Sequence, residues 1–148
     1  MNDATAPTLT VRREIAAPAQ ELFDAWLDAK SLAVWLLPVG TLRTSAKVDP
    51  RVGGAFEIIM QTPSGPVPHT GTYKEIDRPR RLVFTWNSPY AKNNDSLVTI
   101  EFKPTRGVTE IVLTHEKLPS EQVEGHTKGW TSAIEVLAQT YGKQRSTA

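Results

Sequence analysis

Apolar and polar residues alternate at the start of the chain, and this period of two indicates a half-buried β-strand. Leu9, Val11 and Ile15 lie on one side of the strand, with polar residues between them. Pro18 then stands where a helix can begin, because the N–H that proline lacks has no partner in a first helical turn. The sequence therefore predicts one strand and then a helix.

Two short helices are expected after this strand. The first carries an apolar stripe at helical spacing, formed by Leu22, Phe23, Trp26 and Leu27. The second extends through Leu36, and Ser31 is a residue type that caps helix N-termini. Pro38 and Gly40 then end the helical stretch.

The middle of the chain alternates again and is divided by turns rich in Gly, Pro, Asn and Asp. The connections are too short for crossover helices, so the strands must pair antiparallel. One side of the alternation is apolar, which indicates a sheet with one buried face. The six predicted strands are Arg43–Val48, Ala55–Gln61, Val67–Ile76, Arg81–Asn87, Leu97–Lys103 and Thr109–Glu116.

The last segment returns to a helical period. From Pro119 to Tyr141, apolar residues recur every three or four positions, which predicts one long amphipathic helix. Only this helix is long enough to cover a seven-stranded sheet, so we expect the sheet to curl around it. We predict an α+β fold with a flexible tail over residues 1–7 and a single domain over residues 8–145.

The composition of the chain excludes several classes of function. The 148 residues include 17 Lys and Arg against 16 Asp and Glu, and this balance gives no electrostatic case for binding nucleic acid. The absence of Cys excludes disulfides and thiolate chemistry. We find no secretory signal and no apolar run of the roughly 20 residues that a membrane span needs, so we expect a cytoplasmic protein.

Short motifs along nearly the whole chain resemble one family. They are Arg13–Pro18, Leu22–Trp26, Leu32 with Trp35 and Pro38, Val52–Phe56, Gly71–Ile76, Arg81–Trp86, Thr109–His115 and Gly129-Trp130. This ordered set resembles the activator of heat-shock-protein-90 ATPase homologue family in its bacterial single-domain form. That family belongs to the START-like superfamily, which also contains the birch-pollen allergen.

The resemblance implies a helix-grip fold with an internal cavity. In this fold a curved seven-stranded antiparallel sheet wraps around a long C-terminal helix, and two short helices follow the first strand. Family members usually carry a second tryptophan and a glycine before the position of Pro38, whereas this chain has Trp35-Leu36-Leu37. We therefore expect a more aliphatic cavity mouth, and the identity of a ligand does not transfer from relatives.

Aromatic side chains gather on the predicted inward faces. Two interpretations stay open, because the rings either line a cavity for a small apolar or amphipathic ligand or fill the core themselves. The predicted cavity lining comprises Trp35, Phe56, Ile58, Tyr73, Phe84, Trp86, His115, Trp130 and Ile134.

The three histidines lack the spacing of a metal site, so we predict no metal and no cofactor. His115 shares a strand face with Ile111 and Leu113 and is either a hydrogen-bonded histidine at the core edge or a polar anchor in the cavity. His69 follows a proline-rich turn, which favours an exposed side chain. His126, near the start of the last helix, is expected to be partly exposed.

The function that we favour is binding of a small apolar or amphipathic ligand, without catalytic residues. One alternative is a cyclase-like or aromatase-like enzyme that uses His115 or Tyr73 for acid–base chemistry. The other is a co-chaperone-like module that binds proteins. The basic turn Asp77–Arg81 is either a solvated hairpin turn or a docking patch for an acidic partner. We expect no nucleic acid partner and no membrane span, and a homodimer stays open.

Overall fold

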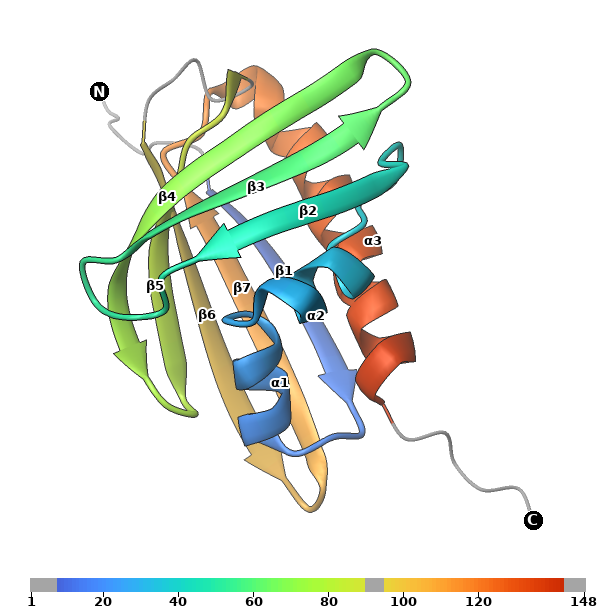
Figure 1. The fold of residues 1–148 in the computed structure, drawn as a ribbon. Helices are drawn as coiled ribbons and strands as arrows, with labels where there is room; N and C mark the ends of the chain where they lie inside the picture. Colours follow the sequence, from blue (N-terminus) through green and yellow to red (C-terminus); the bar gives the residue numbers. More distant parts are fainter. Residues whose placement is uncertain (1–7, 90–94, 143–148) are drawn as a thin grey trace, which may run out of the picture.

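A computed structural model describes residues 8–89 and 95–142 of the chain. Its seven strands form one antiparallel sheet in the order β1-β7-β6-β5-β4-β3-β2 (Figure 1), which confirms the predicted fold class. The strands are β1 (Thr8–Ile15), β2 (Arg43–Val48), β3 (Ala55–Thr62), β4 (Gly65–Asp77), β5 (Arg81–Trp86), β6 (Ser96–Thr105) and β7 (Val108–Glu116). The predicted tail over residues 1–7 and the end of the predicted domain at residues 143–145 lie outside the described ranges.

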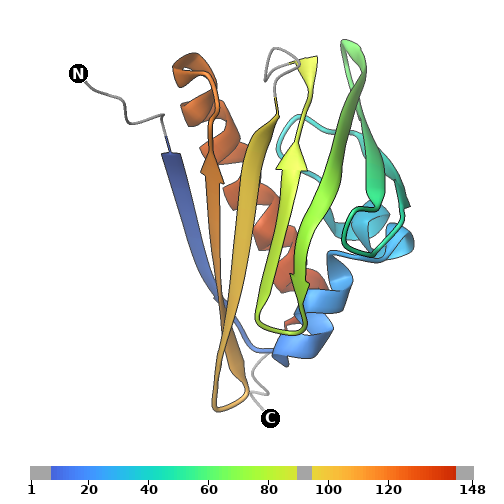
Figure 2. The same cartoon turned by 90° about the vertical axis from the view of Figure 1, so that its left-hand side faces the viewer.

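The sheet is curved because its longest strand changes partner. β4 pairs with β3 along its first part and with β5 along its second part, and the register shifts between Tyr73 and Glu75. Such a bulge bends a strand and increases its twist. Figure 2 shows the neighbouring strands side by side with α3 (Val123–Tyr141) behind them, so the long helix covers one face of the curved sheet.

The helices α1 (Ala19–Ala25) and α2 (Ala29–Trp35) follow β1, as predicted. α1 begins directly after Pro18, but α2 begins before Ser31, so the capping role predicted for Ser31 is wrong. Ser31 lies inside the helix, and its hydroxyl is 2.5 Å from the hydroxyl of Tyr141 on α3. The predicted long helix starts with a 3-10 turn over Ser120–Gln122, and α3 continues from there.

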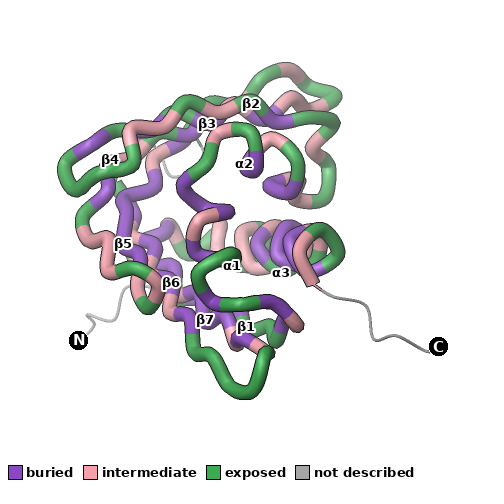
Figure 3. Tube along the Cα trace, turned by 60° about the horizontal axis from the view of Figure 1, so that its bottom comes forward, coloured by how far each residue is buried: buried purple, intermediate pink, exposed green. Residues whose placement is uncertain are grey.

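The three helices lie on the concave side of the sheet, where the buried residues gather (Figure 3). α3 packs mainly against β1 and α2. On this side Arg13 of β1 forms an exposed ion pair with Glu135 of α3, whose Oε1 lies 2.9 Å from Nε of the arginine. Between α3 and the β3–β4 hairpin the packing is looser, and the cavity described below lies there. Within the described residues, no helix is long and apolar enough to span a bilayer.

Candidate functional site

A cavity of about 470 Å³ lies between α3, the β3–β4 hairpin and the loop that joins α2 to β2. This volume is in the range of small-molecule sites. The loop contributes Leu36 and Pro38, which belong to the stretch where the sequence departs from the pattern of the family that it resembles. None of the described residues that line the cavity is Asp, Glu, Lys or Arg. The described lining is therefore formed by apolar side chains and uncharged polar groups.

Small residues on α3 leave room for the cavity. Gly125, Gly129 and Ala133 recur every four positions and lie on one helix face. A Cβ atom added at Gly125 would meet no atom within 4 Å, and one added at Gly129 would lie 3.5 Å from Cβ of Pro38. Gly125 is exposed and the space beside it, at the edge of the cavity, is therefore open, whereas Gly129 faces the loop that borders the cavity.

Two tryptophans form an aromatic wall of the cavity. Trp86 comes from β5 and Trp130 from α3, and their ring centroids are 5.1 Å apart. Both side chains are almost fully buried. Flat aromatic surfaces of this kind provide a large apolar contact for a bound molecule.

A buried relay of hydrogen bonds connects the two tryptophans. The indole Nε1 of Trp130 donates to Nδ1 of His115 over 3.0 Å. Nε2 of His115 lies 2.7 Å from Oγ of Ser96, whose hydroxyl donates to the carbonyl oxygen of Trp86 over 2.5 Å. An indole N–H can only donate, so Nδ1 of His115 must accept and Nε2 must carry the proton. His115 is therefore neutral, and its burial lowers its pKa to about 3.

The predicted cavity residues occupy three different places. Trp86 and Trp130 line the cavity. Phe56, Ile58, Tyr73 and Phe84 line a void of about 10 Å³, which Trp86 and Trp130 also border, and the rings of Phe56, Tyr73 and Phe84 contact one another. Trp35, His115 and Ile134 are buried and line neither space. A ligand-binding role for any of these residues stays a prediction.

The two residues considered for acid–base chemistry are placed away from the cavity. His115 is fully buried and has both ring nitrogens engaged. Tyr73 faces the small void, and burial, together with the nearby carboxylate of Asp49, raises its pKa above the ordinary value. Both groups keep their usual protonation near neutral pH and lie behind other side chains.

His69 is buried, so its predicted exposure is wrong. Its side chain is 5% exposed and lines the cavity, with its ring 4.9 Å from that of Trp86. The proline-rich turn suggested a surface position, but His69 pairs across the hairpin with the buried Ile58 and shares its inward face. Burial lowers the pKa of His69 to about 4, against smaller opposing contributions from the backbone of Ile58 and Val67.

Further cavity residues were not predicted as site residues. They include Gly125, His126, Gly129 and Ala133 on α3, Gln122 in the 3-10 turn before it, and Met60 and Val67 on the β3–β4 hairpin. The spacing of Gly125, Gly129 and Ala133 is the sequence signal that could have located this wall. His126 is half-buried, in agreement with the expected partial exposure.

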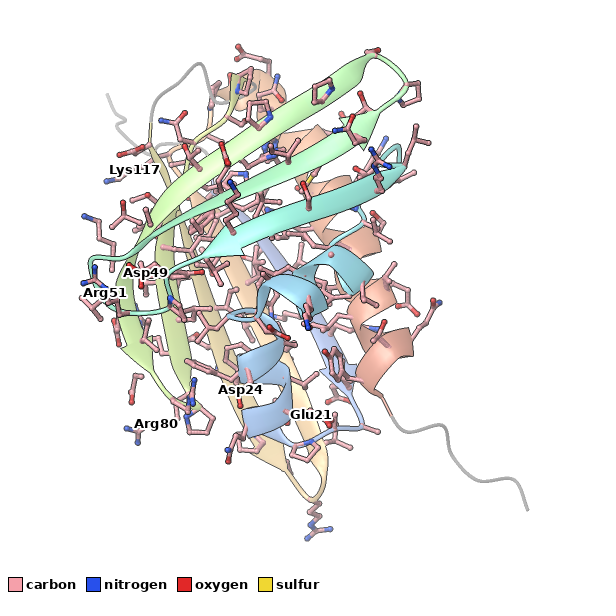
Figure 4. All side chains as sticks on the ribbon, viewed as in Figure 1. Glu21, Asp24, Asp49, Arg51, Arg80 and Lys117 are labelled. Carbon is pink, nitrogen blue, oxygen red and sulfur yellow. The ribbon has the colours of Figure 1, made fainter. Side chains whose placement is uncertain are left out.

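The charged side chains of the described ranges do not line the cavity. Figure 4 places Asp49 and Arg51 at the β2–β3 connection and Arg80 at the turn after β4. Arg80 pairs with Asp77 of the same turn. The other arginines of this turn, Arg78 and Arg81, pair with carboxylates of α1, β4 and β6. These internal pairs match the interpretation as a solvated turn. Within the described ranges, no group of three or more His, Cys, Asp or Glu side chains could hold a metal ion.

The fold and sequence resemble those of solved proteins. A protein from Chromobacterium violaceum is 26% identical with a TM-score of 0.82, over 93% of this chain and 98% of that one. A protein from Nitrosomonas europaea is 27% identical with a TM-score of 0.77, over 93% and 95%. An Hsp90 activator from Plasmodium falciparum is 28% identical with a TM-score of 0.67, over 93% and 99%. No curated protein matches the chain significantly.

A family model describes most of the chain. The model for Activator of Hsp90 ATPase homolog 1-like protein matches residues 16–142, which run from the end of β1 to the end of α3. The match includes every element that contributes to the cavity. The chain therefore belongs to the Activator of Hsp90 ATPase homolog 1-like protein family.

Proposed function

We propose that this protein binds a small, uncharged, apolar or amphipathic molecule in the cavity between α3 and the β3–β4 hairpin. The observation that carries the proposal is the cavity of about 470 Å³ with an aromatic wall formed by Trp86 and Trp130. Pockets for small molecules combine a mainly apolar lining with a few placed polar groups. Here the polar groups include His69, Gln122 and His126.

The electrostatics of the lining favour an uncharged ligand. Burial lowers the pKa values of His69 and His126, so both rings are neutral near pH 7. The described lining contains no carboxylate or cationic side chain that could pair with an ionic group. Moving an unpaired charge from water into such a site is strongly unfavourable.

The test uses a variant that fills the cavity. Gly125→Leu places a side chain in empty space and also favours the helix, since glycine is a poor helix former. The matched control is Gln139→Leu, which adds the same side chain at an exposed position of α3 outside the cavity. We expect wild type and control to bind the neutral dye Nile red with increased fluorescence, and Gly125→Leu to bind it at least about tenfold more weakly.

Circular dichroism of Gly125→Leu checks that the variant is folded. Equal dye binding by wild type and a folded Gly125→Leu protein would contradict the proposed site. If the wild-type protein bound neither Nile red nor smaller neutral aromatics, the proposal would fail, and a role like that of the Plasmodium Hsp90 activator would become the better candidate.

A further inference from the structure

His126 lines the cavity and has one ring nitrogen that bonds to no described group. Its Nδ1 atom lies 2.9 Å from the carbonyl oxygen of Gln122, one turn earlier on the chain. A carbonyl oxygen can only accept, so Nδ1 must carry the proton. A neutral imidazole has a single N–H, and Nε2 of His126 therefore carries a lone pair.

No side chain in the described ranges uses this lone pair. The ring of His115 lies next to that of His126, with its centroid 5.4 Å away and its plane nearly perpendicular. Both ring nitrogens of His115 already form hydrogen bonds, one with Trp130 and one with Ser96. The titratable groups around His126 are His115 on β7 and His69 on β4, and burial keeps all three rings neutral near pH 7.

His126 shares the cavity lining with aromatic side chains. These side chains are Trp86, Trp130 and His69. The ring centroid of Trp86 lies 4.9 Å from that of His69 and 5.1 Å from that of Trp130. A molecule that fills this space and leaves Nε2 without a donor would bury an unsatisfied acceptor. A ligand that combines a flat ring with a donor group avoids this loss.

We infer that the cavity selects uncharged aromatic molecules with a hydroxyl or N–H group that donates a hydrogen bond to Nε2 of His126. This inference rests on the proposed function and specifies the chemical class of the ligand. Phenols and indoles belong to this class, whereas hydrocarbons and ethers of the same shape do not.

The experiment compares naphthol, methoxynaphthalene and naphthalene as competitors of Nile red near pH 7. With the wild-type protein we expect naphthol to bind about five- to tenfold more tightly than the other two, which corresponds to one hydrogen bond. His126→Phe replaces the imidazole with a phenyl ring that has no hydrogen-bond acceptor, so the preference for naphthol should disappear. His126→Gln restores an acceptor and should recover part of the preference.

Naphthalene provides the internal control, since its binding to His126→Phe shows that the cavity is intact. Equal affinities of the wild-type protein for all three compounds would overturn the inference and leave the proposed function standing. A preference for naphthol that persists in His126→Phe would overturn it as well. Failure of every compound and of Nile red to bind the wild type would remove the proposed function and the inference together.

Discussion

Two neighbouring histidines differ in which nitrogen carries the proton, and this difference separates their roles. His115 carries it on Nε2 because Trp130 donates to its Nδ1. His126 carries it on Nδ1 because that atom donates to the carbonyl oxygen of Gln122. Both nitrogens of the first ring bond inside the protein, one of them to Trp130, whereas Nε2 of the second ring has no described partner and is the acceptor that we assign to the ligand. Nitrogen-15 NMR distinguishes the two tautomers directly.

At the residue scale we predict that His115→Phe destabilises the fold. The change removes the acceptor of the Trp130 N–H and the donor to Ser96, both of which are buried. A buried polar group without a partner costs about 1–3 kcal/mol, so the free energy of unfolding should fall by about 2–4 kcal/mol. Urea denaturation measures this loss.

His126→Phe is the matched control for that measurement. His126 is half-buried and bonds only to the backbone of its own helix among the described residues, so its loss should cost under about 1 kcal/mol. Equal destabilisation by the two variants would show that the relay through His115 is not a special contributor to stability.

At the scale of elements, glycines have opposite roles in β4 and α3. On β4, a Cβ atom at Gly71 would overlap the carbonyl oxygen of Thr85 and the ring of Phe56, so this glycine lets the ring lie directly on the strand. On α3, the position of Gly125 is open. The first glycine allows close packing, and the second preserves empty space.

This contrast predicts effects of opposite sign for one substitution. Gly71→Ala should lower the free energy of unfolding by about 1–3 kcal/mol or more, because the strand or the Phe56 ring must move. Gly125→Ala should raise it by up to about 1 kcal/mol, because alanine favours the helix and meets no atom. Urea denaturation of both variants measures the two free energies of unfolding. A stabilised Gly71→Ala protein would show that the Phe56 ring does not pack directly on β4 at Gly71.

Elements were more predictable from sequence than the site. Each predicted strand start from Arg43 to Thr109 lies within two residues of the observed one, because alternation and turn residues act locally. The cavity depends on how side chains from distant elements fill space. Phe56, Tyr73 and Phe84 have the inward pattern of cavity residues but contact one another, and the open volume lies farther along the sheet. Sequence patterns show which face is buried and not whether that face is filled.

At the scale of the whole molecule, three histidines from three elements are kept neutral around one interior region. His69 lies on β4, His115 on β7 and His126 on α3, and burial is the largest cause of the lowered pKa in each case. In the unfolded chain all three return to an ordinary value near 6.5. Below that pH the unfolded state binds more protons than the folded state, so acid favours unfolding.

We therefore predict that stability is full above about pH 6.5 and falls as the pH decreases toward the folded-state pKa values of His69 and His115, about 4 and 3. Each of these two groups should lower the free energy of unfolding by about 1.4 kcal/mol per pH unit in this window. Urea denaturation near pH 7.5, 6 and 5 measures the slope above the range where most carboxylates titrate. A free energy of unfolding that stays constant from about pH 7.5 to 5 would mean that these histidines take up protons in the folded protein as readily as in the unfolded chain, and the neutral state assigned to His69 and His115 would be wrong.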